Sequence, residues 1–319
     1  MDVGSQDMTV LSQPETYMPT YLVGDASDHL RNISDETVDL IVSSPPYNIG
    51  KSYEKQSRLT LEEYLLWQTD VLKELARTLK PTGSLCWQAG TYVNAGNLLP
   101  LDIPFYSIIN SLGLQLRNRI VWRFNFGLNS DRRFSGRYET VLWFTKSDRY
   151  KFNLDPVRIP QLYPGKRHSA SHREKSGKLS GNPKGKNPSD VWEFDAKKDF
   201  LENPIWDFPN VKNNHPEKED HPCQFPIELA ERCVLAFTDE NDLVLDPFVG
   251  TGSTALAAQK QKRRSIGIDK EKSFVDISKS RSEKICDGTL RIRPIGKPIA
   301  RPSQSAKVAR IPAEWKEIE

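Results

Sequence analysis

Short apolar runs alternate with longer amphipathic stretches along most of the chain. Residues 38–42 (VDLIV) form the clearest run, because aliphatic side chains fill four of its five positions and the turn sequence Ser43-Ser44-Pro45-Pro46 ends it abruptly. Runs of this composition, bounded by turn residues, are typical of buried strands. We therefore expect strands at residues 21–23, 38–42, 84–87, 114–122, 140–145, 243–245 and 265–268.

The amphipathic stretches have helical spacing. Residues 60–79 show it best, because Thr60 and Glu63 match a capping box and an apolar stripe follows until Pro81 and Gly83 end it. Further helices are expected at residues 27–32, 103–112, 226–237, 253–261 and 274–283. Strands separated by helices predict an α/β fold with a mostly parallel, doubly wound sheet, and an antiparallel hairpin is expected around residues 125–137.

This alternation stops between about residues 150 and 214, where proline, glycine, lysine and asparagine are frequent. A loop of about 65 residues is usually functional or disordered. Since βα units lie on both sides of it, the pattern predicts one α/β domain that a small insertion interrupts. We expect a flexible leader at residues 1–19, two halves of the domain at 20–150 and 216–287, the insertion at 151–215 and a basic, proline-rich tail at 288–319.

The composition fits an intracellular globular protein. Apolar residues make up 37% of the 319 residues, which is enough for a sizeable core. No apolar run reaches the roughly 20 residues of a membrane span, and the N-terminus lacks the pattern of a secretory signal. Four widely spaced cysteines form no CxxC pair, so neither a zinc site nor a disulfide framework is indicated. We expect a cytoplasmic protein without a metal site or a membrane partner.

Positive charge is concentrated in the insertion. The net charge of +3 is uninformative by itself. Residues 163–190, however, contain two acidic residues, Glu174 and Asp190, beside seven arginines and lysines: Lys166, Arg167, Arg173, Lys175, Lys178, Lys184 and Lys186. Such a segment is either a solvated, disordered loop or a loop that contacts phosphates.

A glycine-containing loop follows the strand at residues 243–245. Gly250 and Gly252 allow a ligand to approach the backbone, and the amides of the following helix start suit a polar or anionic group. Ala255 stands where a dinucleotide fingerprint needs a third glycine, and the lysine of a P-loop is absent. Asp269 ends the next strand, where a carboxylate can accept hydrogen bonds from ribose hydroxyls. The alternative is an ordinary βα turn with a solvated aspartate.

A second loop, Ser44-Pro45-Pro46-Tyr47, ends the strand at residues 38–42. Both prolines lack an N–H group, so nearby carbonyls tend to stay free as acceptors, and Ser44 adds a side-chain oxygen. Two acceptors beside an aromatic ring form a site for a planar molecule that carries an amino group. The alternative is a proline turn that caps the strand, with Tyr47 packed in the core.

Together these loops resemble those of the DNA amino-methyltransferases, and their order along the chain resembles the β class of that family. The resemblance covers about residues 20–285. It rests on Gly24-Asp25, residues 44–47, the strand from Glu139 to Lys146, residues 221–226, residues 246–254 and Gly267-Ile268-Asp269.

The resemblance implies a Rossmann-like, S-adenosylmethionine-dependent methyltransferase fold and a site residue by residue. Asp246, Pro247, Phe248, Gly250, Thr251 and Gly252 would surround S-adenosylmethionine, with Asp269 on its ribose, Asp25 near its adenine and residues 221–226 over its methionine end. Ser44 and the Pro45 carbonyl would accept hydrogen bonds from the amino group of a flipped base, Pro46 would complete the turn and Tyr47 would stack on the base. The insertion would be the target-recognition region, with its seven basic residues on DNA phosphates. Residues 20–150 would then be the catalytic half and residues 216–287 the cofactor-binding half.

Several alternatives stay open. Cys223 lies in a Pro-Cys-Gln sequence like that of the C5-cytosine enzymes, but it precedes the glycine loop, so we interpret it as a spacer. A non-catalytic DNA-binding module and an RNA or protein methyltransferase are further readings. Ser44 and Phe225 favour N4 of cytosine as the target, whereas Asn48-Ile49-Gly50-Lys51 favours N6 of adenine.

The resemblance also implies partners and a setting. Double-stranded DNA is the expected substrate, and a cognate restriction endonuclease is a further candidate partner. The protein would act as a monomer or homodimer in a prokaryotic or phage-like cytoplasm, in association with the nucleoid.

Overall fold

The strands that the sequence predicts join into one twisted sheet. The computed structural model describes residues 17–49, 59–94, 96–124, 130–161, 163–171, 173–192, 211, 215–221 and 223–293. In that part of the chain the main sheet has the order β1 (Thr20–Val23), β10 (Arg264–Asp269), β9 (Leu243–Asp246), β2 (Val38–Ser43), β3 (Leu79–Ala89), β7 (Tyr138–Thr145), β6 (Gln115–Arg123) and β8 (Val191–Trp192). Among these strands β7 runs against both of its neighbours, and every other pair is parallel. The expected fold class, with its antiparallel hairpin, is confirmed.

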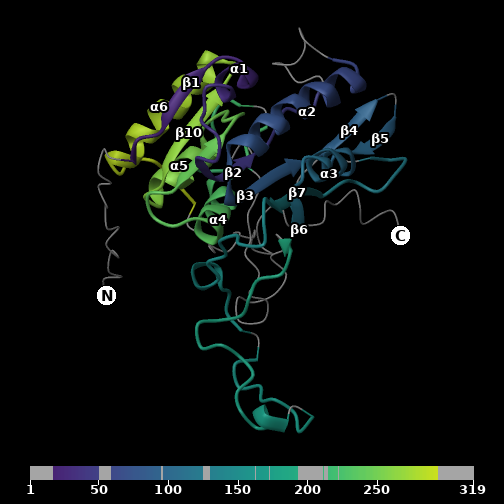
Figure 1. Cartoon of the computed structure of the whole chain (residues 1–319), viewed down its shortest axis with the longest axis vertical. Coiled ribbons are helices and arrows are strands. Elements are labelled where there is room, and N and C mark those ends of the chain that lie inside the picture. Colours follow the sequence, from purple (N-terminus) through teal and green to yellow (C-terminus); the bar gives the residue numbers. More distant parts are fainter. Residues whose placement is uncertain are drawn as a thin grey trace, which may run out of the picture.

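Helices cover both faces of this sheet (Figure 1). On one face α1 (Ala26–Leu30), α2 (Leu61–Thr78) and α3 (Asp102–Ser111) pack in one buried apolar cluster. On the other face α4 (Ile227–Phe237), α5 (Ser253–Lys260) and α6 (Lys272–Cys286) contribute to a second cluster. Strand β2 belongs to both, since Leu40 and Val42 face one cluster and Val38 and Ile41 the other. The capping box at Thr60 and Glu63 is present at the start of α2.

Two local predictions were wrong or incomplete. The helix ends at Thr78, before residues 80–83 as expected, but we expected the next strand to start at residue 84, whereas β3 begins at Leu79 and an irregular register against β2 accommodates these residues. Lys80 reaches Asp39 at this irregularity, at 2.8 Å. The pair β4 (Thr91–Asn94) and β5 (Asn97–Pro100) was missed, because its short strands carry no clear alternation.

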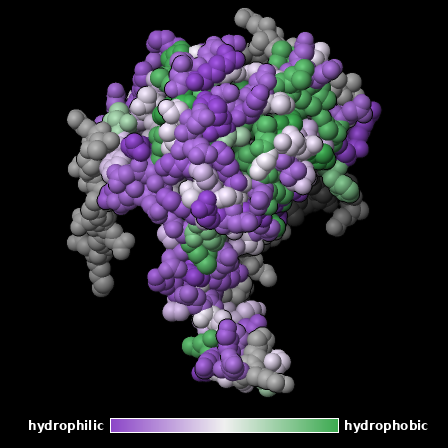
Figure 2. All heavy atoms as spheres, viewed as in Figure 1, coloured by the Kyte–Doolittle hydropathy of each residue, from purple (hydrophilic) through white to green (hydrophobic). Residues whose placement is uncertain are grey.

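Part of the insertion forms an arm, defined here as residues 158–190. It follows a short 3-10 helix, η2 (Asp155–Val157), and contains a second one, η3 (Arg173–Lys175). Its two sides pair at Ile159 with Lys186 and at Arg167 with Leu179. The arm projects away from the body (Figure 1), and its surface is mostly hydrophilic (Figure 2).

Some predictions fall beyond the described residues. The expected leader lies there up to residue 16, as does the tail from residue 294 and the part of the insertion at residues 193–210 and 212–214. No helix within the described ranges combines the length and apolar character that crossing a membrane would require.

Candidate active site

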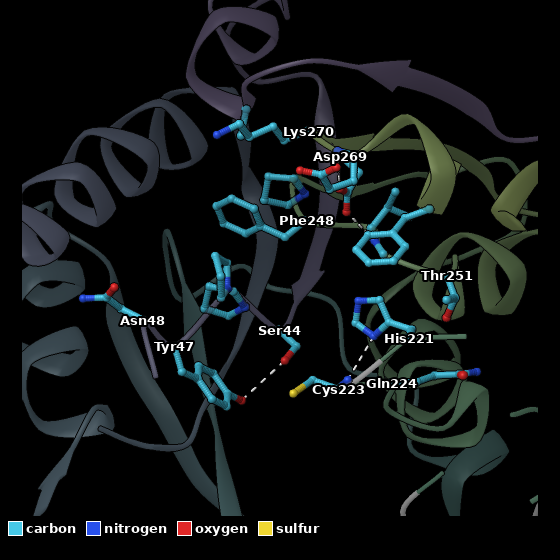
Figure 3. A pocket seen from close by; sticks show the side chains of 18 of the residues that line it. Ser44, Tyr47, Asn48, His221, Cys223, Gln224, Phe248, Thr251, Asp269 and Lys270 are labelled. Carbon is cyan, nitrogen blue, oxygen red and sulfur yellow. Dashed lines mark hydrogen bonds between the residues drawn. The ribbon is translucent and has the colours of Figure 1, made fainter. Parts of the chain in front are cut away.

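A cavity of about 340 Å³ lies at the carboxyl ends of β2, β9 and β10. Ligand sites of open α/β sheets occur at this edge, where loops from neighbouring parallel strands meet. Both loops that the sequence singled out line the cavity, and Figure 3 shows their side chains facing each other across it. The lining residues that we predicted are Asp25, Ser44, Pro45, Pro46, Tyr47, Pro247, Phe248, Gly250, Thr251 and Asp269.

The glycine loop is held in its shape from behind. Gly250 and Gly252 have φ angles of +50° and +89°, a region in which a side chain is strained. The Ser278 hydroxyl donates to the Gly250 carbonyl at 2.7 Å, and the Arg281 guanidinium donates to the Thr251 carbonyl at 2.5 Å. These two hydrogen bonds hold the Gly250 and Thr251 carbonyls and thereby fix the shape of the loop.

Asp269 links the glycine loop to the end of β10. Its Oδ2 atom accepts from the Gly250 N–H at 2.8 Å, and its Oδ1 atom accepts from the Glu271 N–H at 2.9 Å. Burial raises the pKa of this carboxyl, although the two N–H donors oppose that shift. Asp25 lies across the same end of the cavity, where it caps α1 by accepting from the Ser27 N–H.

Asp246 and Gly252 do not line the cavity, contrary to the simplest reading of the glycine motif. Gly252 caps α5 instead. Asp246 is buried and accepts from the Ser43 hydroxyl at 2.6 Å and from the Phe248 N–H at 3.1 Å. It therefore joins the two loops, which are 203 residues apart in sequence. Burial raises the pKa of Asp246 to about 6, and its Oδ2 atom has no hydrogen-bond partner among the described residues.

The Ser-Pro-Pro-Tyr loop presents acceptors to the cavity. The Pro46 carbonyl accepts from the Tyr64 hydroxyl at 2.9 Å, so it is occupied, whereas no described residue donates to the Pro45 carbonyl. The Tyr47 ring is 9% exposed and packs on Gly90, where an added Cβ would lie 2.5 Å from ring atom Cε2. Its hydroxyl lies 3.4 Å from the Ser44 hydroxyl and donates to Glu139 Oε2 at 3.3 Å. Tyr47 thus packs against the apolar core and also forms part of the cavity wall.

The segment before α4 closes one side of the cavity. The Cys223 N–H donates to His221 Nδ1 at 3.1 Å, so the neutral ring carries its proton on Nε2. Burial, together with Lys218, lowers the pKa of His221 to about 4. The Ser253 hydroxyl donates to the Phe225 carbonyl at 2.8 Å and thereby connects this segment to the start of α5. Cys223, which we interpreted as a spacer, lies in the lining with its sulfur toward Ser44 and Tyr47 (Figure 3).

Several lining residues were not predicted. Tyr64 and Trp67 belong to α2, where helical spacing indicated core packing, and their position in the cavity depends on how α2 docks. Lys270, Glu271 and Phe274 follow Asp269 directly, so the end of that strand was the available signal.

The seven basic residues of the insertion lie on the arm, and none of the six whose side chains the structure describes lines the cavity. Lys166, Lys175, Lys178 and Lys186 are exposed, and no ion pair is found for them among the described residues. Lys184 pairs with Asp155 at 2.5 Å, and Arg167 donates to the Gly177 carbonyl at 2.6 Å, so these two also stabilise the arm. The Arg173 side chain lies outside the described part of the structure.

Comparisons with known proteins agree with this geometry. The N6_N4_Mtase family model, described as DNA methylase, matches residues 38–280. The type II methyltransferase M.BglII of Bacillus subtilis is 48% identical over 268 residues, which cover 84% of this chain and 69% of that protein. The type II methyltransferase M.ScaI of Streptomyces caespitosus is 35% identical over 271 residues, covering 82% and 80%.

A solved structure is similar as well. The protein TTHA0409 of Thermus thermophilus, crystallised with S-adenosyl-L-methionine, superimposes with a TM-score of 0.56 at 25% identity. The match covers 84% of this chain and 95% of that one.

Proposed function

Because this chain belongs to the N6/N4 DNA methylase family, we propose that it methylates the exocyclic amino group of a flipped base in double-stranded DNA, with N4 of cytosine as the favoured target. Family membership makes it a DNA methyltransferase of the restriction-modification type that uses S-adenosylmethionine. The observation that carries the proposal is the hydrogen bond between Ser43 and Asp246, which fixes the two predicted loops beside one cavity.

The cavity fits S-adenosylmethionine in shape and charge. Phe248 and Trp67 supply apolar surface for a purine ring, and Asp269 supplies carboxylate oxygens for ribose hydroxyls. Three carboxylates, Asp25, Asp269 and Glu271, face the cavity beside one ammonium group, Lys270, which suits a ligand with a positive centre. When bound, this cofactor supplies a methyl group on a positively charged sulfur atom.

The residues at the other end of the cavity would orient the base. Ser44 Oγ and the Pro45 carbonyl are acceptors that can hold the two hydrogens of an amino group, which directs the nitrogen lone pair toward the methyl donor. The rigid diproline turn and the Tyr64 hydroxyl on the Pro46 carbonyl keep these acceptors in place. The rate enhancement then comes from positioning and from fixed dipoles, and no covalent enzyme intermediate is needed.

The arm is the proposed DNA contact. Its exposed lysines carry positive charge away from an otherwise balanced body, as binding to phosphates requires. We keep residues 151–215 as the proposed target-recognition region and residues 20–150 and 216–287 as the two halves of the catalytic domain. A cognate endonuclease, and action as a monomer or homodimer, remain part of the proposal.

Cytosine is favoured because a neutral hydroxyl, Ser44, precedes the prolines and Phe225 precedes Pro226. Adenine is the second candidate, because Asn48-Ile49-Gly50-Lys51 directly follows Tyr47. The Asn48 side chain is used structurally, because it donates to the Leu59 carbonyl at 2.7 Å and accepts from the Leu59 N–H at 3.1 Å.

The substitution Ser44→Ala tests the proposal. We expect the variant to bind S-adenosylmethionine like the wild type in calorimetry, and to transfer methyl groups to DNA at least about 10²-fold more slowly, since one fixed hydrogen-bond partner of the reacting group is lost. Ser273→Ala on the exposed side of α6 is the matched control. Turnover at the wild-type rate in Ser44→Ala would contradict the proposed role. Binding without any transfer in the wild type would favour the non-catalytic reading.

A further inference from the structure

A chain of polar groups leads from the cavity into the sheet behind Ser44. Ser44 Oγ lies 3.4 Å from the Tyr47 hydroxyl, which donates to Glu139 Oε2 at 3.3 Å. Glu139 is the second residue of β7, and the Gln88 side chain on the neighbouring strand β3 donates to the same oxygen. Ser44 lines the cavity, while Glu139 lies beyond its wall. This series of hydrogen bonds thus connects the proposed amino-group site with a carboxylate.

The carboxylate of Glu139 sets the direction of both hydrogen bonds in this series. An ionised carboxylate accepts hydrogen bonds and donates none, so the Tyr47 proton points toward Glu139. The Tyr47 oxygen is then free to accept from the Ser44 hydroxyl. This arrangement leaves the lone pairs of Ser44 Oγ for a donor in the cavity, which is what an amino group would be.

Methyl transfer to an amino group creates a need for such a chain. The reaction, which rests on the proposed function, leaves the nitrogen with a positive charge and one proton in excess. A serine hydroxyl can pass a proton on but cannot hold an extra one near neutral pH. A carboxylate two hydrogen bonds away is a far stronger base than a hydroxyl and can take up the proton until it passes to solvent.

We propose that Glu139 is the final proton acceptor of the reaction and that Ser44 and Tyr47 relay the proton to it. The nitrogen lone pair forms the N–C bond as the S–C bond of the donor breaks and its electron pair stays on sulfur. The nitrogen proton passes to Ser44 Oγ, the Ser44 proton to the Tyr47 oxygen and the Tyr47 proton to Glu139 Oε2. The products are a neutral methylated base, a neutral thioether and a protonated Glu139.

The surroundings of the chain suit this role. Glu139 is only partly buried, so it can return the proton to solvent after each turnover. Burial and the nearby Glu139 raise the pKa of Tyr47 well above its usual value, so its hydroxyl gives up a proton only while it receives one. Cys223 and Tyr64 are also near Tyr47, but the Tyr64 hydroxyl is committed to the Pro46 carbonyl.

Removing the hydroxyl of Tyr47 separates this role from base stacking. Tyr47→Phe keeps the ring, Glu139→Gln keeps the shape of the acid, and we expect each to slow single-turnover methyl transfer by about 10²-fold or more. The double variant should be no slower than either single variant, because all three interrupt one path. Affinities for S-adenosylmethionine and DNA should stay within about twofold of the wild type. Tyr106→Phe and Glu62→Gln make the same chemical changes at exposed positions and serve as controls.

A second measurement does not depend on activity. The ¹³Cζ resonance of Tyr47, assigned through Tyr47→Phe, should shift in Glu139→Gln and not in Glu62→Gln. Glu139→Asp, which keeps the carboxylate, should regain part of the lost rate. An active wild type in which Tyr47→Phe and Glu139→Gln both transfer at the normal rate would overturn the relay alone, as would additive losses in the double variant. A wild type that transfers no methyl group would overturn the proposed function and the relay with it.

Discussion

Asp246 illustrates how much of the site depends on one buried side chain. Its carboxyl binds Ser43 and the Phe248 N–H, and burial raises its pKa to about 6 from the usual value near 3.8. Well below pH 3.8 both the folded and the unfolded chain hold this proton, so Asp246 adds no pH dependence to the stability there. Between about pH 4 and pH 6 the unfolded chain releases this proton while the folded chain keeps it, so each rise in pH favours unfolding. Asp246 should therefore lower the free energy of unfolding as the pH rises through this window.

The variant Asp246→Asn isolates this effect. Between pH 4 and pH 7 the wild type should lose about 2 kcal/mol of unfolding free energy relative to the variant, since one pKa unit corresponds to about 1.4 kcal/mol and the unfolded carboxyl is already partly ionised at pH 4. Urea unfolding of both proteins across this range measures it. The buried His221 titrates in both proteins and cancels in the difference. Parallel stability curves would show that Asp246 does not titrate in this range.

At the level of single residues the sequence identified chemistry better than orientation. Ser44, Tyr47 and Asp269 were found from loop sequences at strand ends and line the cavity. Asp246 was implied by the family resemblance, yet it binds Ser43 behind the cavity. Gln88 and Glu139 carried no local signal of a shared role, because their contact exists only through the pairing of β3 with β7.

Among the elements, the arm gives the clearest functional expectation. Lys166, Lys175 and Lys178 are exposed on it, and replacing all three with alanine should weaken DNA binding for every sequence. The slope of log K against log salt concentration should fall by about 0.9 for each lost phosphate contact. Filter binding at several salt concentrations measures the slope.

A triple variant on the body provides the control for the arm. Lys73, Lys279 and Lys284 are exposed on α2 and α6, so their replacement removes the same charge from other surfaces. This control should retain the wild-type slope. If both triple variants change the slope equally, net charge rather than the arm determines binding, and the proposed DNA contact is wrong.

Element boundaries show where local sequence patterns are insufficient. Residues 80–83 read as a helix stop, and the helix does end at Thr78, but an interaction between Lys80 and Asp39 and the pairing with β2 extend β3 back to Leu79. The sequence of the arm shows no regular pattern, because the two sides of the arm pair through isolated bridges and turns rather than through continuous strands. Long, strongly periodic elements such as α2 were predicted within a residue or two.

For the whole molecule, the two halves of the chain cannot be separated without breaking the sheet. Strands β9 and β10 from the C-terminal part lie side by side between β1 and β2 from the N-terminal part. This interleaving places the ends of β2, β9 and β10 at one cavity. Local patterns predicted the strands and helices, whereas their spatial order depends on long-range pairing and was available only through the family resemblance.

The most direct test uses the whole protein in a cell. The chain is expressed in a bacterial host without DNA methyltransferases, and the genome is sequenced by a method that distinguishes modified bases. We predict N4-methylcytosine at one short recurring sequence, and its absence in cells that express Ser44→Ala at the same level. N6-methyladenine at such a sequence would keep the reaction and overturn the choice of base. A genome free of both modified bases, in cells that contain the folded wild-type protein, would contradict the proposed function.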